Sequence, residues 1–236
     1  MKGEENRLNK RRLVVFSGAG MSADSGLKTF RDNNGLWEDH DVSEVATPAA
    51  WKANPKLVLR FYNERRKQLY RALPNKAHEL VAQLENLFEV CVVTQNIDDL
   101  HERAGSTNVI HLHGELKKVQ SEKYPDLVYS WDKELLELGD LCERGHQLRP
   151  HVVWFGEEVP KIPEAIQQIQ MADILIVIGS SLNVYPAAGL IHYAPDVAKC
   201  FLIDPNPVGM GLSENWEVIA KSAPEGMEML YKAFSA

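Results

Sequence analysis

The chain has 236 residues, enough for one large domain with a smaller module inserted in it. Hydrophobic residues make up 44% and charged residues 25%, as in globular proteins, and the net charge of −7 argues against nucleic acid as a partner. The three cysteines form no CxxC pair, and no stretch reaches the ~18 apolar residues of a membrane span. We therefore expect a cytoplasmic protein without a membrane partner.

Short apolar runs alternate with helical patterns along the chain. The runs predict buried strands at 13–16, 90–94, 109–112, 174–178 and 199–204. Apolar residues at near-helical spacing predict helices at 55–73, 75–86, 162–171 and 225–234. This alternation predicts an α/β fold, a parallel sheet with helices on both faces.

Two regions interrupt the alternation. Residues 28–51 are polar and predict a long functional loop with short helical pieces. Residues 117–150 are rich in charge and poor in strands that could join the sheet. Because 117–150 lies between two predicted strands, we expect a small inserted module there, packed around its own apolar residues Tyr124, Leu127, Val128, Tyr129 and Trp131.

The first predicted strand ends in a run of small residues, 18–26. Glycines let the backbone approach a pyrophosphate closely, and a following helix offers unpaired N–H groups to it. The run is not a clean GxGxxG motif, so tight packing of small residues is an equal alternative to nucleotide binding.

Polar residues follow the next two strands. In 94–101, amide and carboxylate side chains stand where ligands of parallel sheets bind, although Asn96 or Asp98 alone would more often be a helix cap. In 111–115, His113 suits a general base. A structural histidine and a His111/His113 metal pair are the alternatives, but no third ligand stands nearby.

Seven short motifs occur in a fixed order: Gly18-Ala19-Gly20-x-Ser22-Ala23-x-Ser25-Gly26, Thr29-Phe30-Arg31, Gly35-Leu36-Trp37, Thr94-Gln95-Asn96-Ile97-Asp98, His113-Gly114, Trp154-Phe155-Gly156-Glu157 and Gly179-Ser180-Ser181. In this order they resemble the sirtuin family, class III of the bacterial type. The resemblance runs from about residue 13 to residue 203.

The resemblance implies a Rossmann-like NAD-binding domain made of 1–27, 75–116 and 151–236. Residues 28–74 would supply the cofactor loop and the helical part of a small domain, and 117–150 the inserted module. NAD would be the co-substrate, and the residues implied to bind it are Gly18, Ala19, Gly20, Ala23, Phe30, Arg31, Gln95, Asn96, Asp98, Gly179, Ser180 and Ser181.

The resemblance also implies the activity, which is NAD-dependent removal of acyl groups from lysine in proteins or peptides. The products would be nicotinamide, free lysine and O-acyl-ADP-ribose. His113 is implied as the general base, with Asn96 and Asp98 as further catalytic residues, and His111 as structural. The substrate peptide would pair as a strand near Val152, Trp154 and Phe155, for which a buried aromatic strand is the plain alternative.

The acyl preference follows from Ala46, Tyr62 and Arg65, which match positions by which class III sirtuins accept acidic acyl groups. An arginine can pair with a carboxylate through two bonds, a tyrosine can donate its hydroxyl, and an alanine leaves room. In the plain alternative, Arg65 and Arg66 belong to a solvated basic helix face. We expect desuccinylase or demalonylase activity, with deacetylase activity alongside.

The chain departs from the family pattern in two places. Most sirtuins bind a structural zinc through four cysteines, whereas only Cys142 remains here, with His146 and His151 as weak further candidates. We therefore expect no metal. After the last strand, Asp204 stands where the family has an asparagine and could bond a ribose, and Ala223 could contact the adenine.

Two other functions compete with deacylation. One is an ADP-ribosyltransferase or NAD hydrolase on the same scaffold, but Tyr62, Arg65 and the 152–157 segment argue for a peptide substrate, because a pure NAD hydrolase would not need them. The other is a non-catalytic NAD sensor, and the presence of both Asn96 and His113 argues against it. The sequence does not predict the oligomeric state.

Overall fold

The computed structural model describes residues 10–28, 36–37, 40–207 and 212–236. Its larger part is a six-stranded sheet in the order β11-β10-β9-β1-β4-β5, in which every neighbouring pair is parallel. The strands are β1 (Arg12–Ser17), β4 (Glu89–Thr94), β5 (Val109–His111), β9 (Ile174–Ile178), β10 (Lys199–Ile203) and β11 (Trp216–Ile219). Five of them match the predicted strands, and β11 was not predicted.

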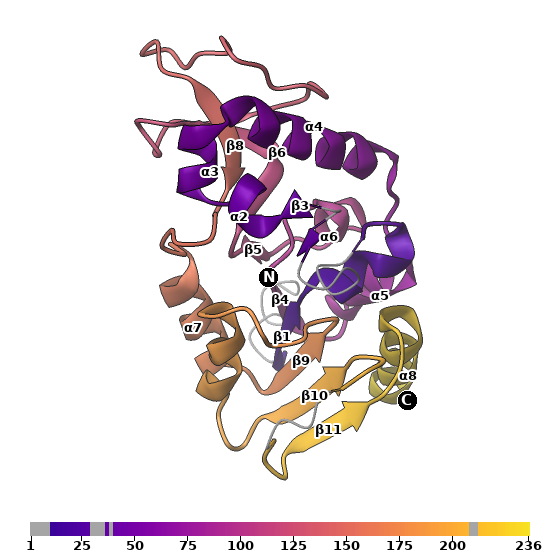
Figure 1. Cartoon of the computed structure of the whole chain (residues 1–236). Coiled ribbons are helices and arrows are strands. Elements are labelled where there is room, and N and C mark those ends of the chain that lie inside the picture. Colours follow the sequence, from indigo (N-terminus) through magenta and orange to yellow (C-terminus); the bar gives the residue numbers. More distant parts are fainter. Residues whose placement is uncertain (1–9, 29–35, 38–39, 208–211) are drawn as a thin grey trace, which may run out of the picture.

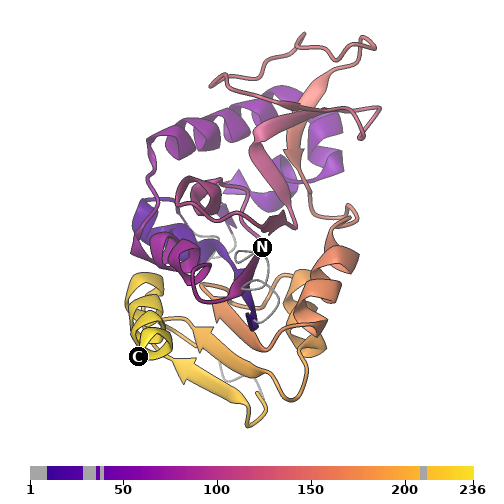
Figure 2. The same ribbon diagram turned by 180° about the vertical axis from the view of Figure 1, so that it is seen from behind.

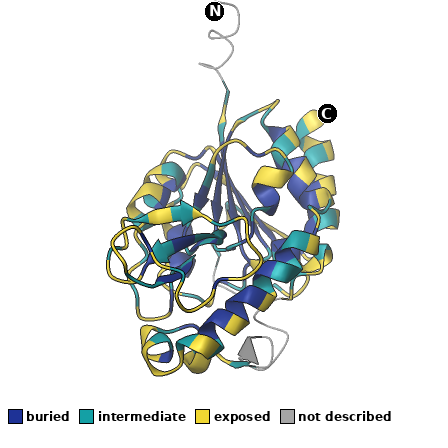
Figure 3. Ribbon diagram, turned by 90° about the horizontal axis from the view of Figure 1, so that it is seen from above, coloured by how far each residue is buried: buried dark blue, intermediate teal, exposed yellow. Residues whose placement is uncertain are grey.

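Helices cover both faces of this sheet (Figures 1 and 2). On one face, α7 (Ile162–Gln170) and the 3₁₀ helix η2 (Ala187–Tyr193) pack on the side chains of β1, β4, β9 and β10. On the other, α5 (Lys76–Leu84) and α8 (Ala223–Ser235) pack on the alternate side chains of the same strands. The strands are buried on both sides (Figure 3), so the predicted α/β fold is confirmed.

The remaining elements gather beyond one end of the parallel sheet (Figure 1). A three-stranded antiparallel sheet, in the order β7-β6-β8, is formed by β6 (Gly114–Ser121), β7 (Val128–Ser130) and β8 (Leu148–Val152). It packs against α4 (Pro55–Arg71). Smaller elements complete the chain: η1 (Ala19–Ser25), β2 (Leu36–Trp37), β3 (His40–Asp41), α2 (Val42–Val45), α3 (Pro48–Ala53) and α6 (Leu100–Arg103).

Buried polar groups of α4 connect it to the small sheet. Asn63 donates to the Leu136 carbonyl at 3.0 Å and accepts from the Leu136 N–H at 2.9 Å. Arg66, which is fully buried, donates through Nε to the Leu116 carbonyl at 3.1 Å and through Nη1 to Asn63 at 2.7 Å. The alternative that placed Arg66 on a solvated helix face is therefore wrong.

The packing expected for residues 117–150 holds only in part. Leu127, Tyr129 and Trp131 pack against a buried cluster of Leu59, Val119, Leu136, Cys142 and Leu148. Val128, however, is 37% exposed, because it points away from this cluster on a short strand. Tyr124 instead stacks edge-on against His146, with 5.3 Å between the ring centroids.

Two buried histidines lie beneath the ends of β1 and β4. His78 accepts the Asn75 N–H through Nδ1 in a capping box, and its ring meets His101 edge-on with 4.9 Å between centroids. His101 Nε2 lies 3.0 Å from the hydroxyl of Ser17, which itself donates to Thr94. Burial lowers the pKa of His78 to about 4 and that of His101 well below its usual value, so both rings stay neutral in the fold.

We expect this burial to make the protein less stable in mild acid. In the unfolded chain His78 takes up a proton below its ordinary pKa of 6.5, whereas in the fold it does so only near pH 4. The free energy of unfolding therefore falls as pH falls from 6.5 to about 4. His78→Gln, which keeps an acceptor at the capping-box position, should flatten this slope by up to ~1.4 kcal/mol per pH unit in urea denaturation. An unchanged slope would exclude His78 as a source.

Candidate active site

The predicted site residues gather at the carboxyl edge of the parallel sheet, where ligands of such sheets bind. Gly18 to Gly20 follow β1, Gln95 to Asp98 follow β4, His113 follows β5, and Gly179 to Ser181 follow β9. Asp204 follows β10. Segments that are far apart in sequence thus meet at one edge, from which the chain passes into the small sheet through β6 (Figure 1).

The glycine turns after β1 and β9 contact each other through their backbones. Gly20 N–H donates to the Gly179 carbonyl at 2.8 Å, and Gly18 N–H to the Ile178 carbonyl at 3.0 Å. A Cβ atom on Gly18 would stand 2.7 Å from the Gly179 oxygen. The φ angle of Gly179 is +60°, and a Cβ there would stand 2.2 Å from the Met21 nitrogen. The glycines are therefore required by backbone contact between the two turns.

We expect Gly179→Ala to destabilise the protein strongly. The new Cβ would displace the backbone of Met21, so a loss of roughly 3 kcal/mol or more in the free energy of unfolding is expected. Gly26→Ala is the matched control, because Gly26 also has a positive φ, +83°, but open space around its Cβ position. It should lose only about 1–2 kcal/mol, measured by the same urea denaturation. Equal losses would contradict the contact.

The polar residues after β4 bond to both glycine turns. Gln95 donates to the Ser180 hydroxyl at 2.9 Å, and Asn96 donates to the Gly18 carbonyl and to Ser22, each at 3.1 Å. Asp98 accepts from the Ser22 hydroxyl at 2.9 Å and also from the Leu100 N–H at 3.2 Å, although the N-cap residue of the next helix is Asp99. Burial raises the pKa of Asp98, more than these two bonds lower it.

A hydrogen bond to the backbone defines which ring nitrogen of His113 carries the proton. Its Nδ1 lies 2.9 Å from the Gln95 carbonyl oxygen, which can only accept, so Nδ1 carries the proton and Nε2 is the basic nitrogen. Burial lowers the pKa of His113 more than this bond raises it, which keeps the ring neutral near pH 7. Its carbonyl accepts the Val153 N–H at 2.9 Å. His113 thus lies between the strand edge and the 152–155 segment.

His111 does not form a metal pair with His113. Its Nδ1 lies 3.0 Å from the Asn96 carbonyl, and its Nε2 lies 2.7 Å from a carboxylate oxygen of Glu102. Burial alone would lower the pKa of His111, but the bond to Glu102 and its charge outweigh burial and raise it. Both nitrogens are used within the protein, as a structural histidine requires.

The three residues that the acyl preference rests on lie near the expected peptide segment. Ala46, Tyr62, Val152 and Trp154 belong to one buried cluster, and the Ala46 carbonyl accepts the Phe155 N–H at 3.0 Å. The guanidinium carbon of Arg65 lies 4.3 Å above the ring of Phe61, one turn earlier on α4. The sequence places Arg65 and Tyr62 three residues apart, and the helix brings them to one face.

Residues 152–155, which are expected to bind the substrate peptide, do not form a continuous buried strand, the alternative interpretation of this segment. The strand β8 ends at Val152, and residues after it leave the sheet. Trp154 is 2% exposed, whereas the side chain of Phe155 is 45% exposed. An exposed aromatic residue directly after a buried one leaves Phe155 accessible to a binding partner.

The other predicted NAD residues differ in how far they are exposed. Ala19 and Ala23 of η1 are exposed, and Ser181 is half-buried. Asp204 is buried and accepts the Asn206 N–H at 2.9 Å, and Ala223 begins α8. Phe30 and Arg31 lie outside the described residues.

Sequence reasoning missed a buried ion pair behind this segment. Arg149 donates to both carboxylate oxygens of Glu157, at 2.6 and 3.0 Å. Arg149 lies in β8 and Glu157 in the turn that follows it, so no single helix or strand period relates the two residues in the sequence. The fold brings them together because the chain turns back after β8.

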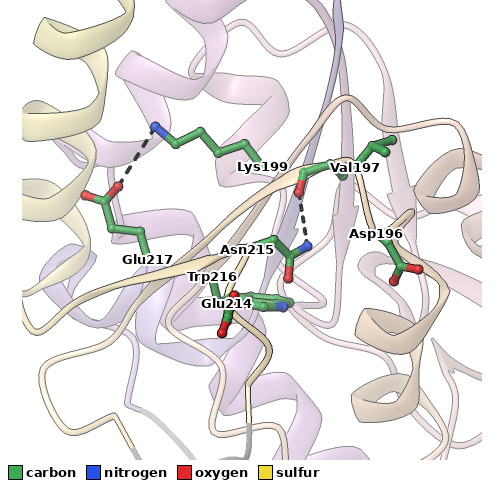
Figure 4. Close-up of a pocket in the computed structure, with 8 residues that line it drawn as sticks. Asp196, Val197, Lys199, Glu214, Asn215, Trp216 and Glu217 are labelled. Carbon is green, nitrogen blue, oxygen red and sulfur yellow. Dashed lines mark hydrogen bonds and ion pairs between the residues drawn. The ribbon is translucent and has the colours of Figure 1, made fainter.

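A surface hollow of about 480 Å³ lies away from these residues (Figure 4). It is lined at the starts of β10 and β11, by Lys199, Trp216 and Glu217 among others. Because the sheet is parallel, the starts of these strands lie at the edge opposite the glycine turns. The hollow is therefore separate from the candidate site.

Comparison with protein families matches residues 18–186 to the Sir2 family. The chain belongs to the Sir2 family. It is 55% identical to a Helicobacter pylori protein over 92% of this chain and 95% of that one, and 44% identical to an Escherichia coli K12 protein over 97% and 85%. Both relatives are named NAD-dependent protein deacylase. The predicted membership of the bacterial class III sirtuins is thus confirmed.

Solved Sir2 structures share the fold. A Sir2 homologue mutant in complex with ADP-ribose superposes with a TM-score of 0.86 at 36% identity, covering 99% of this chain and 96% of that one. A Sir2 homologue–NAD complex gives a TM-score of 0.84 at 35% identity, covering 99% and 93%. The Rossmann-like arrangement predicted for this Sir2 protein is confirmed.

The residues of this Sir2 protein fit NAD. The two glycine turns pack closely together at the strand edge, and Gln95 and Ser180 place an amide and a hydroxyl there. Such groups bond phosphates, ribose hydroxyls and carboxamides. None of the helices in the described residues is long and apolar enough to cross a bilayer.

The family's zinc ligands do not fit. Cys142 Sγ donates to the Ser121 hydroxyl at 3.4 Å, and His151 Nδ1 bonds the Gln120 side chain at 2.6 Å. The described part of the chain contains no group of three or more His, Cys, Asp or Glu residues that could hold a metal ion. One thiol and scattered histidines cannot supply four tetrahedral ligands. Asn63 and Arg66 instead tie the small sheet to α4.

We accordingly expect a chelator to leave this Sir2 protein unchanged. After EDTA treatment the melting temperature and the deacylase rate should stay within experimental error, and purified protein should carry far less than one zinc per chain. Asn63→Ala should lower the free energy of unfolding by about 1–3 kcal/mol, because it leaves both backbone groups of Leu136 unpaired. A melting temperature that drops in EDTA and recovers with zinc would contradict this account.

Proposed function

We propose that this Sir2 protein is an NAD-dependent protein-lysine deacylase that prefers acidic acyl groups, succinyl and malonyl, and also removes acetyl groups. Its substrates would be acyl-lysine proteins of the cytoplasm, and its products nicotinamide, free lysine and O-acyl-ADP-ribose. Nucleic acid and membranes have no part in this activity.

The deacylase activity rests on overall similarity. Relatives 53–55% identical over 92% of this chain are named NAD-dependent protein deacylase. One solved Sir2 structure, at 29% identity and a TM-score of 0.79, is described with a deacetylated peptide and an acetyl ADP-ribose. Deacylation with NAD as co-substrate is therefore the broad function of this enzyme.

The observation that carries the acyl preference is the placement of Tyr62. This tyrosine of α4 is fully buried and accepts a hydrogen bond from the indole of Trp154, in the segment expected to bind the peptide. Ala46, with its small side chain, lies in the same buried cluster. Arg65 stands one helical turn from Phe61 and brings a permanent positive charge to that side of α4. A carboxylate-bearing acyl chain would be bonded by the arginine and the phenol.

His113 would act as the general base of this reaction. NAD would supply the ribose from which nicotinamide leaves and whose hydroxyl oxygen receives the acyl group. The neutral ring offers Nε2, because Nδ1 donates to the Gln95 carbonyl. Gln95 is fixed in turn by Ser180, so the base is oriented by a second residue of the same edge. Asn96 and Asp98, both buried, fix Ser22 and the first glycine turn.

The test is a mass-spectrometric assay of one lysine peptide in succinyl, malonyl and acetyl forms, with and without NAD. Acidic acyl groups should be removed faster than acetyl, only with NAD, with one nicotinamide released per lysine freed. If acetyl removal is faster, the deacylase stands and the acidic preference is wrong. If NAD is consumed with no peptide cleaved, the NAD hydrolase or ADP-ribosyltransferase alternative replaces deacylation.

A further inference from the structure

The indole of Trp154 makes a hydrogen bond that runs in only one direction. Its Nε1 lies 3.0 Å from the Tyr62 hydroxyl oxygen, and the two ring centroids are 6.5 Å apart. An indole nitrogen donates and never accepts. The Tyr62 oxygen is therefore the acceptor in this bond, which does not use the O–H proton of Tyr62.

The position of this indole is fixed from behind. Arg149 lies flat against it, with the guanidinium carbon 3.5 Å from the ring centroid. The same guanidinium pairs with both oxygens of Glu157 and donates to the Val152 carbonyl at 2.7 Å. Glu157 also accepts the backbone N–H of Trp154 at 2.7 Å. Both the ring and the backbone of Trp154 are thus held by one buried ion pair.

The hydrogen bond suits an acidic ligand. A carboxylate accepts only, so it can use a tyrosine solely as a donor. Burial raises the pKa of Tyr62 above its usual value, more than the indole bond lowers it, so the hydroxyl keeps the proton that it would donate. An indole that already donates to the phenol oxygen also polarises its O–H and strengthens the donor.

We propose that Trp154 is a positioning residue for acyl specificity, whose indole N–H orients the Tyr62 hydroxyl as a donor toward a carboxylate of the acyl group. This inference rests on the proposed preference for acidic acyl groups. It assigns the side chain of Trp154 to the acyl end of the substrate, in addition to the backbone of its segment, which would meet the peptide. The Arg149–Glu157 pair acts behind Trp154 as its support.

The experiment removes the indole N–H and little else. Trp154→Phe keeps an aromatic ring on Arg149, and β-(3-benzothienyl)alanine at position 154 keeps the full bicyclic shape without the N–H. In both, KM for the succinyl peptide should rise by about 3- to 10-fold, as expected for the loss of one oriented hydrogen bond. The kcat for that peptide should stay within about twofold, and KM for the acetyl peptide should rise less than KM for the succinyl peptide.

A double-mutant cycle separates this role from a structural one. If Trp154 acts through the Tyr62 hydroxyl, Trp154→Phe should raise KM for the succinyl peptide no further in a Tyr62→Phe background. An equal rise in that background, or an equal loss on acetyl and succinyl peptides, overturns the inference. If the wild-type enzyme shows no preference for the succinyl peptide and removes acetyl faster, the proposed acidic preference fails instead. If wild type prefers succinyl and the benzothienyl variant behaves like wild type, only the role of Trp154 fails.

Discussion

Arg65→Met should abolish most succinyl removal and leave acetyl removal nearly intact. A charge-assisted pair with a carboxylate contributes roughly 1.5–3 kcal/mol, which corresponds to about a 10- to 150-fold loss in kcat/KM for the succinyl peptide. Because the acetyl group has no carboxylate, kcat/KM for the acetyl peptide should not fall for this reason. Methionine removes the guanidinium that lies over the Phe61 ring but keeps an unbranched apolar side chain in its place. The measurement is kcat/KM for paired succinyl and acetyl peptides at saturating NAD.

Two further variants of α4 serve as controls. Arg60→Met removes an exposed arginine from the same helix, so it changes the net charge equally and should leave both peptides unaffected. Arg65→Lys keeps the charge but loses the planar fork, and its succinyl kcat/KM should fall between those of wild type and Arg65→Met. Parallel losses on both peptides in Arg65→Met would show that the residue supports the fold of α4 and does not select the acyl group.

The sheet and its ligand edge could be predicted because they depend on local patterns. Short, continuous apolar runs rich in β-branched residues, such as 174–178, are typical of strands buried on both faces, and small polar residues after them mark the carboxyl edge. The strand β11 escaped prediction because its burial is uneven: Ile219 is buried, but the two residues before it are exposed. An edge strand has one neighbour and needs no continuous apolar run.

The interior of the small domain could not be predicted, since it depends on contacts between distant residues. Arg66 directly follows Arg65 in the sequence, yet it is fully buried and donates to the Leu116 carbonyl, fifty positions later. The bond from Trp154 to Tyr62 spans ninety-two positions. Neither of these two contacts corresponds to a regular spacing of residues in the sequence. The residue types could be predicted to be important, but the directions of their hydrogen bonds required the fold.

His113→Asn should reduce kcat for every acyl peptide by about 10²- to 10⁴-fold, the usual contribution of a general base. Asparagine can still donate to the Gln95 carbonyl, as Nδ1 does, but it offers no basic nitrogen in place of Nε2. The loss should therefore be the same for succinyl and acetyl peptides, unlike that of Arg65→Met. Stabilisation of the variant by NAD in thermal melts shows whether the NAD site is intact. A variant that retains more than about a tenth of wild-type kcat would exclude His113 as the base.

The pH dependence distinguishes His113 from its neighbour His111. A general base works only when neutral, so kcat/KM falls on the acid side of its pKa, by up to tenfold per pH unit. Burial lowers the pKa of His113 below 6.5, whereas Glu102 raises the pKa of His111 above 6.5, although burial opposes it. If His113 is the base, kcat/KM stays constant from pH 8 down to about 6.5 and declines only below it. A decline that begins above 6.5 would instead report the ionisation of His111, and the two histidines would exchange roles.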